Sequence, residues 1–115
     1  MFRYLSWIAL ALTTGCSTQV APVIDESLLP VYSPQVHTNT YQRWGEEGVQ
    51  RISRAQRQAL YAIARQPACD QVTFLALTET MSQPPATIVT FVECRNLWRF
   101  YIDQDARVLS SEHRG

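Results

Sequence analysis

Few side chains in this sequence are of the types that perform catalysis or bind metal ions. The chain has three cysteines and two histidines. His37 lies in a polar segment and His113 in a polar tail, and with the cysteines they do not form the closely spaced ligand cluster of a zinc site. A hydrolytic triad needs a nucleophile, a base and an orienting acid that converge in a cleft. Acid pairs such as Asp103 and Asp105 are more typical of turns, so we expect no enzyme, no metal and no cofactor.

The first cysteine, Cys16, follows a segment with the features of a secretory signal. Arg3 gives the segment a positive start, residues 4–12 are mainly apolar, and the small residues Thr14 and Gly15 precede the cysteine. These three features define a bacterial export signal. The apolar stretch is under half of the roughly 20 residues that a membrane-spanning helix needs. The segment is therefore expected to direct export rather than to span the membrane.

The tripeptide Thr14-Gly15-Cys16 resembles the lipobox of bacterial lipoproteins, in which a small residue and Gly or Ala precede the cysteine that is lipidated. Thr13 stands where that family usually has leucine. The resemblance implies removal of residues 1–15 and acylation of Cys16 with chains such as palmitate. Ser17 after the cysteine implies sorting to the outer membrane, facing the periplasm. An ordinary signal peptidase would also accept this small-residue site, and the product would then be a soluble periplasmic protein.

The charge pattern argues against a nucleic-acid partner. The sequence has ten basic and ten acidic residues, and every basic residue is arginine. Nucleic-acid binding needs a clustered excess of positive charge, whereas Arg51, Arg54 and Arg57 share their segment with Glu46 and Glu47. We therefore expect no nucleic-acid partner. The expected partners are another protein and, through the lipid anchor, the membrane.

The mature chain of about 100 residues is long enough for one domain. Residues 16–40 are rich in Pro, Ser, Thr and Gln, a composition typical of flexible linkers. A tether of this length could stretch to about 80 Å. Alternatively, Val31 and Tyr32 or residues 20–24 could dock as an extended strand on a partner. The remaining boundaries are a single domain over residues 41–110 and a polar tail over residues 111–115.

Apolar residues at steps of three and four predict an amphipathic helix from Tyr41 onward. Gly45 and Gly48 each cost about 1 kcal/mol relative to alanine in a helix, so the helix is expected to be broken near Gly48. Ser53 and Gln56 form a capping-box pattern, and Pro67 ends the helix. The expected buried stripe consists of Tyr41, Trp44, Gly48, Ile52, Ala55, Ala59 and Ile63.

Alternation with a period of two then predicts strands over residues 71–79, 87–94 and 97–103, with a short fourth strand near Val108. Arg95 and Asn96 are expected to form a two-residue hairpin loop. The predicted fold class is α+β: an N-terminal helix packed on an antiparallel meander of three to four strands.

A two-residue loop would place Phe91 opposite Phe100, Val89 opposite Ile102 and Glu93 opposite Trp98. The predicted core wall is then Phe74, Val89, Phe91, Trp98, Phe100 and Ile102. The candidate partner surface on the other sheet face comprises Leu75, Leu77, Ile88, Val92 and Tyr101. This second face could be covered by the linker or the C-terminal segment, or exposed to a partner.

Cys69 and Cys94 remain once Cys16 is assigned to lipid. The start of the first strand lies beside the end of the second in an antiparallel meander, so the two cysteines are expected to meet at that edge. The periplasm is oxidising, which favours a disulfide over a metal site or free thiols.

Together these features predict a membrane-anchored lipoprotein that acts as a structural or protein-interaction module, in an envelope or a secretion or conjugation assembly. A small periplasmic inhibitor or immunity-type lipoprotein that binds a target enzyme is the alternative.

Overall fold

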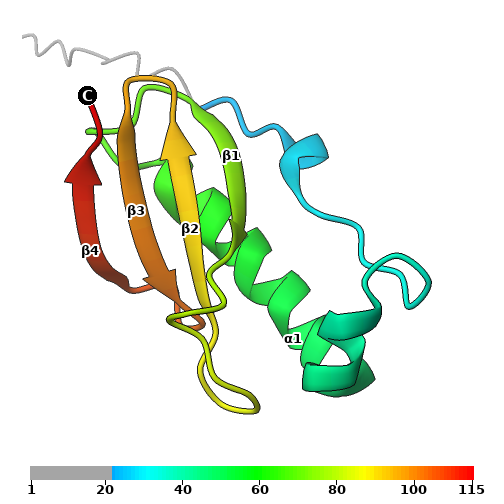
Figure 1. The fold of residues 1–115 in the computed structure, drawn as a ribbon. Coiled ribbons are helices and arrows are strands. Elements are labelled where there is room, and N and C mark those ends of the chain that lie inside the picture. The colour runs from blue at the N-terminus through cyan, green and yellow to red at the C-terminus, as the bar shows by residue number, and fades with distance from the viewer. Residues whose placement is uncertain (1–21) are drawn as a thin grey trace, which may run out of the picture.

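The computed structural model of the protein describes residues 22–115, so the predicted signal segment and Cys16 lie outside the described residues. One long helix packs on one face of a four-stranded antiparallel sheet with strand order β1-β2-β3-β4 (Figure 1). The predicted α+β class is confirmed. The elements in chain order are η1 (Glu26–Leu28), α1 (Thr38–Ala64), β1 (Val72–Leu77), β2 (Val89–Cys94), β3 (Trp98–Asp103) and β4 (Val108–His113).

Helix α1 is kinked at Gly45, where φ is 72° and ψ is 170°. The predicted break is thus present, but three residues before Gly48, because glycine adopts positive φ without a steric penalty. Gly48 is helical and buried, and a Cβ there would lie 2.9 Å from the Cβ of Trp44. The helix runs through Ser53 without interruption, so the capping pattern at that residue does not mark a helix start.

The β2–β3 hairpin differs by one residue from the predicted register. Val92 lies opposite Phe100, and Phe91 lies opposite Tyr101. The loop has three residues, 95–97, and its last residue, Leu97, has a φ of 77°. A three-residue hairpin of this type needs a left-handed residue at its end, and the sequence places leucine there.

This one-residue difference from the predicted register exchanges the buried and exposed faces of β1 and β2 relative to β3, because successive strand residues point to opposite sides. Leu75 and Val92 are buried against α1 together with Phe100 and Ile102, and Ile88 is buried in a second cluster with Trp44. The predicted partner surface is therefore wrong for Leu75, Ile88 and Val92. Leu77 packs partly buried against the second cluster, and only Tyr101 lies on the face away from α1.

The predicted core wall is correct at Phe100 and Ile102, which are buried, and Trp98 packs partly buried against the same cluster. Val89 is also buried, and the Ser82 hydroxyl accepts a hydrogen bond from its backbone at 2.9 Å. The prediction is wrong for the two phenylalanines of β1 and β2, which point away from the helix.

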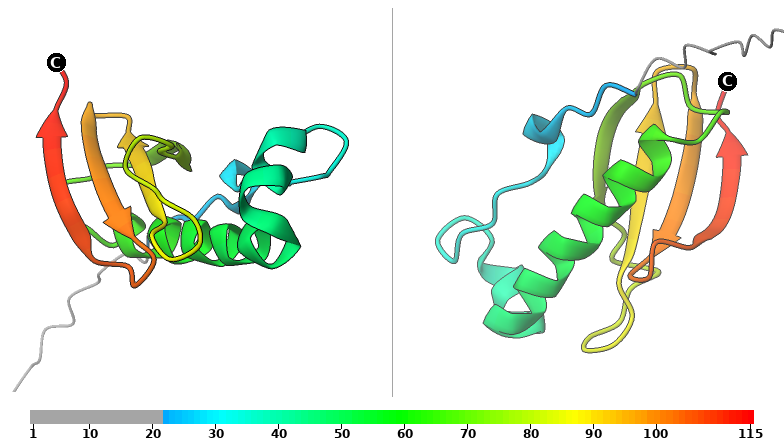
Figure 2. Two further views of the ribbon diagram at one scale, coloured as in Figure 1. Left: turned by 60° about the horizontal axis from the view of Figure 1, so that its bottom comes forward. Right: turned by 180° about the vertical axis from the view of Figure 1, so that it is seen from behind.

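The segment predicted as a flexible tether follows a defined path from residue 22 onward (Figure 2). Ile24, Leu28 and Leu29 pack partly buried against the main core, and Tyr32 packs against the second cluster. Residues 22–37 are thus part of the domain. Only residues 16–21 of the predicted tether are left, and they lie outside the described residues.

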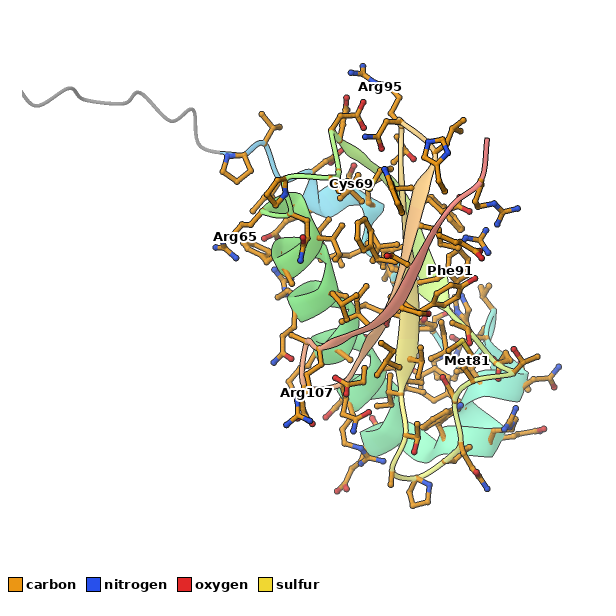
Figure 3. All side chains as sticks on the ribbon, turned by 90° about the vertical axis from the view of Figure 1, so that its left-hand side faces the viewer. Arg65, Cys69, Met81, Phe91, Arg95 and Arg107 are labelled. Carbon is orange, nitrogen blue, oxygen red and sulfur yellow. A yellow bond between two sulfur atoms is a disulfide. The ribbon has the colours of Figure 1, made fainter. Side chains whose placement is uncertain are left out.

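Cys69 and Cys94 form the predicted disulfide, with sulfur atoms 2.05 Å apart and Cα atoms 5.6 Å apart. The bridge joins the loop after α1 to the end of β2, at the end of the sheet where Arg95 also lies (Figure 3). Strand β4 extends to His113, so most of the predicted polar tail belongs to the sheet.

Candidate functional site

Within residues 22–115, helix α1 covers one face of the sheet and no helix covers the other face (Figures 1 and 2). Because Leu75, Val92 and Phe100 point toward α1, the alternation along each strand directs their neighbours to the opposite side. We call this side the outer face. Its central residues are Phe74, Phe91, Glu93, Arg99 and Tyr101.

Two aromatic rings give the outer face its apolar character. The rings of Phe74 and Phe91 lie 5.8 Å apart, and Phe74 is 50% exposed. Figure 3 shows Met81, an exposed residue of the β1–β2 loop, on the same side of the sheet as Phe91. Isolated exposed apolar residues are common on proteins, but neighbouring aromatic rings on an open sheet face are typical of an interface.

Arg99 links the aromatic and charged groups of this face. Its guanidinium carbon lies 4.5 Å from the centre of the Phe91 ring, a cation–π geometry. It donates hydrogen bonds to the Tyr101 hydroxyl at 3.3 Å and to the Glu93 carboxylate. The hydrogen bonds to Tyr101 and Glu93 raise the pKa of Arg99 above its ordinary value, although burial opposes them. The side chain therefore stays charged and fixed in orientation.

The acidic groups of the outer face are each matched by a donor. A guanidinium nitrogen of Arg114 lies 3.7 Å from a carboxylate oxygen of Glu93, and the Tyr101 hydroxyl donates to Glu112 at 3.2 Å. The face thus combines exposed aromatic rings with balanced charges, which can bind another protein surface but offers no excess charge for nucleic acid.

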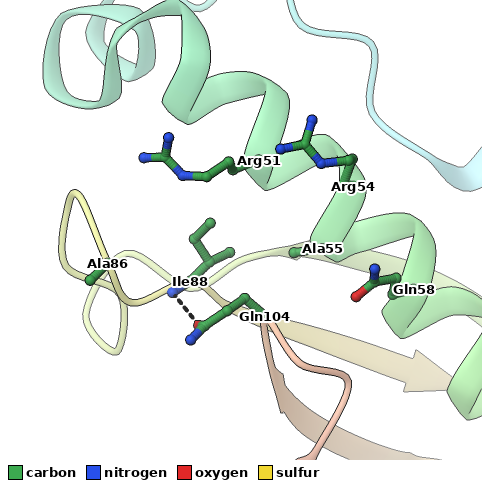
Figure 4. A pocket seen from close by; sticks show the side chains of 7 residues that line it. All are labelled: Arg51, Arg54, Ala55, Gln58, Ala86, Ile88 and Gln104. Atoms are coloured by element: carbon green, nitrogen blue, oxygen red, sulfur yellow. Dashed lines mark hydrogen bonds between the residues drawn. The ribbon is translucent and has the colours of Figure 1, made fainter.

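A separate hollow of about 190 Å³ lies between α1, the β1–β2 loop and the β3–β4 turn (Figure 4). Arg51 and Arg54 line it on the helix side, and Gln104 accepts a hydrogen bond from the Ile88 backbone at 3.0 Å. Arg51 donates to the Pro85 carbonyl at 3.0 Å. The side chains that line this hollow are those of arginine, glutamine, alanine and isoleucine.

The two histidines have local structural contacts. His37 Nδ1 accepts a hydrogen bond from the Ser33 backbone, and its ring packs edge-on against Tyr32. His113 packs edge-on against Trp98. Across residues 22–115, no group of three His, Cys, Asp or Glu side chains is placed to hold a metal ion. No helix in this same part of the chain is sufficiently long and apolar to cross a bilayer.

Comparison of the chain with family models, with curated proteins and with solved structures finds no match. The candidate site therefore depends on geometry alone. The sequence placed Tyr101 on the candidate partner surface. It also placed Phe74 and Phe91 together on one sheet face, but it assigned that face to the core. The signal that was missed is the length of the β2–β3 loop, since a three-residue loop directs both phenylalanines outward.

Proposed function

We propose that the protein is a membrane-anchored lipoprotein of the cell envelope, facing the periplasm, and that its outer face binds a protein partner. The observation that carries this proposal is the pair of neighbouring rings, Phe74 and Phe91, on a sheet face that no helix of the described part of the chain covers. The lipid anchor is inferred from the resemblance of residues 14–16 to a lipobox.

The chemistry of the outer face supports a protein rather than another ligand class. Aromatic residues and arginine are enriched at interface centres, where they supply large contact areas. Arg99 is held against Phe91 before any partner arrives, which reduces the entropy lost on binding. The proposed role is a structural or interaction module of an envelope assembly, such as a secretion or conjugation machine.

In-cell photo-crosslinking tests the partner. A photoreactive amino acid replaces Phe74 in the full-length protein, and a matched control replaces Leu109, which is 49% exposed on edge strand β4. We expect a discrete adduct from position 74 that is absent or much weaker from position 109. An adduct with an enzyme would favour the inhibitor or immunity-type alternative. Recovery of the monomer alone from both positions would contradict a protein partner at this face.

A point substitution provides the second test. Phe74→Arg places a charge among the rings but removes little buried surface, because half of the native side chain is already exposed. We therefore expect loss of the adduct or of co-purification with little change in melting temperature. Leu109→Arg is the matched control. Unchanged partner recovery with Phe74→Arg would contradict the role of the outer face.

A further inference from the structure

Four chain segments meet at one end of the molecule, which we call the hairpin pole. It contains residues 22–23, the loop after α1, the β2–β3 hairpin and the end of β4 (Figures 1 and 3). The Asn96 amide donates to the Ala68 carbonyl at 2.8 Å, and the Arg114 backbone donates to the Leu97 carbonyl at 2.9 Å. Val23 and Asp70 line one hollow there. The described chain therefore begins at the hairpin pole.

The short connection from Cys16 to this pole limits its distance from a membrane. This step rests on the proposed lipid at Cys16. Six residue steps separate Cys16 from Pro22, and an extended chain spans at most about 3.6 Å per residue. The hairpin pole would therefore stay within about 22 Å of the anchored residue. The β1–β2 loop, at the other end of β2, is about one strand length, roughly 20 Å, further away.

Two exposed arginines lie at the hairpin pole. Arg95 lies in the hairpin with a 68% exposed side chain, and Arg114 follows β4 with a 46% exposed side chain. Arg65, at the end of α1, lies lower in Figure 3, and its guanidinium turns back to donate to the Tyr61 carbonyl at 3.2 Å. Asp70 pairs with Arg95 at 3.2 Å, and Glu93 is shared between Arg114 and Arg99. Exposed pairs of this kind are weak, so the guanidinium groups can exchange their partners for phosphate oxygens.

We propose that the hairpin pole lies against the surface of an anionic phospholipid bilayer, with Arg95 and Arg114 on headgroup phosphates. The strands run from this pole toward the β1–β2 loop (Figure 1). The sheet therefore stands upright on the membrane, and the outer face is open to a partner from the side. The lipid holds the protein at the membrane, and the arginines set its orientation.

Headgroup quenching tests this orientation in the full-length lipoprotein. The protein is purified from membranes and reconstituted in vesicles of phosphatidylethanolamine and phosphatidylglycerol that include a lipid with a nitroxide on its headgroup. A fluorophore is attached to Leu97→Cys at the hairpin pole, or to Ala86→Cys in the β1–β2 loop. Both native residues are exposed. We expect clearly stronger quenching at position 97 than at position 86. Equal quenching, or stronger quenching at position 86, would overturn the proposed orientation.

Charge removal tests the role of the arginines. Each basic residue near an anionic leaflet strengthens binding by about fivefold. The double variant R95Q/R114Q should therefore lose most of the difference in quenching between positions 97 and 86. The matched control R43Q/R107Q removes the same charge from exposed sites away from the pole and should retain that difference. High salt should act on the native protein as the double variant does at low salt, a result that does not depend on the folding of the variant.

Mass analysis of Cys16 separates the two proposals. If Cys16 is acylated but position 97 is not quenched more strongly than position 86, the proposed orientation is wrong and the proposed anchor is not. Stronger quenching at position 97 that R95Q/R114Q and salt both leave unchanged contradicts the phosphate contacts. An unmodified Cys16 contradicts the proposed anchor, and the orientation fails with it, because the short reach no longer applies.

Discussion

Gln56 is a fully buried polar residue on α1, and its partner comes from the N-terminal segment. Its amide nitrogen donates to the Tyr32 hydroxyl at 2.9 Å, while its amide oxygen has no partner among the described residues. Burial raises the pKa of Tyr32 despite this hydrogen bond, so the hydroxyl remains protonated around neutral pH. One hydrogen bond therefore connects the N-terminal segment to the buried side of α1, between residues 24 positions apart.

Removal of the Tyr32 hydroxyl is expected to destabilise the fold. Tyr32→Phe leaves the buried Gln56 amide without any partner, which typically costs about 1–3 kcal/mol. The free energy of unfolding from denaturant titration measures this loss. In the double variant Tyr32→Phe/Gln56→Met, both polar groups are absent, so much of the loss should be restored. Equal stability of Tyr32→Phe and the native protein would contradict this account.

Glu26 makes a second connection between the N-terminal segment and α1. Its carboxylate accepts a hydrogen bond from the Tyr61 hydroxyl and lies 2.9 Å from Arg57. The hydrogen bond from Tyr61, followed by the one from Arg57, lowers the pKa of Glu26 below its ordinary value. The folded protein therefore holds this proton less tightly than the unfolded chain does.

This pKa shift predicts the direction of a pH effect. The stabilisation by Glu26 is present above the ordinary carboxyl pKa and is lost as the pH falls through the lowered pKa of the folded state. Glu26→Gln should therefore lose less stability than the native protein between pH 7 and acidic pH. Melting curves of both proteins across this range measure the difference. An equal loss in both proteins would contradict a role for this carboxylate.

At the scale of elements, the sequence predicted the helix, the meander and the disulfide, but not which face of the sheet is buried. Alternation along a strand divides its residues between two faces. The length of the loop between two strands decides which face of the first strand lies on the same side of the sheet as a given face of the second. Leu97 is responsible for the difference, because leucine rarely adopts the positive φ that the three-residue loop requires. Gly or Asn at that position would have indicated the observed register.

Leu97→Gly tests this loop. Positive φ costs a residue with a Cβ about 1–2 kcal/mol, whereas glycine adopts it freely but loses more entropy on folding. We expect a gain of up to about 1 kcal/mol in the free energy of unfolding. Asn96→Gly should instead destabilise, since the Asn96 amide bonds the Ala68 carbonyl. The opposite result, with a gain at Asn96 and a loss at Leu97, would favour the two-residue loop.

The disulfide is expected to make a large contribution to stability. The cysteines are 25 residues apart, and closing a loop of that length in the unfolded chain is worth about 3.5 kcal/mol on the chain-entropy model. This is a large share of the 5–15 kcal/mol that is typical of a domain. Melting curves with and without reductant should differ markedly. A Cys69→Ala/Cys94→Ala variant, unaffected by reductant, is the control, and unchanged native curves would contradict the prediction.

At the scale of the whole molecule, the domain begins earlier than its composition indicated. Residues 22–37 contain prolines and polar residues typical of a linker, so their composition did not indicate their apolar contacts. Ile24, Leu28 and Leu29 are spaced too irregularly to form a periodic pattern, yet all three pack on the main core. Their burial could not be predicted because it depends on the path of the chain beside β1, which no local pattern encodes.

Truncation tests this boundary directly. A chain that begins at Ser17 and one that begins at Pro22 should melt at the same temperature, because both contain the packed residues Ile24, Leu28, Leu29 and Tyr32. A chain that begins at Thr38, the first residue of α1, loses three partly buried apolar side chains and the Tyr32–Gln56 hydrogen bond. Since full burial of one such side chain stabilises by about 1.5–3 kcal/mol, we expect a loss of about 2–4 kcal/mol. Equal melting temperatures for all three chains would mean that residues 22–37 contribute nothing to the fold and act only as a linker.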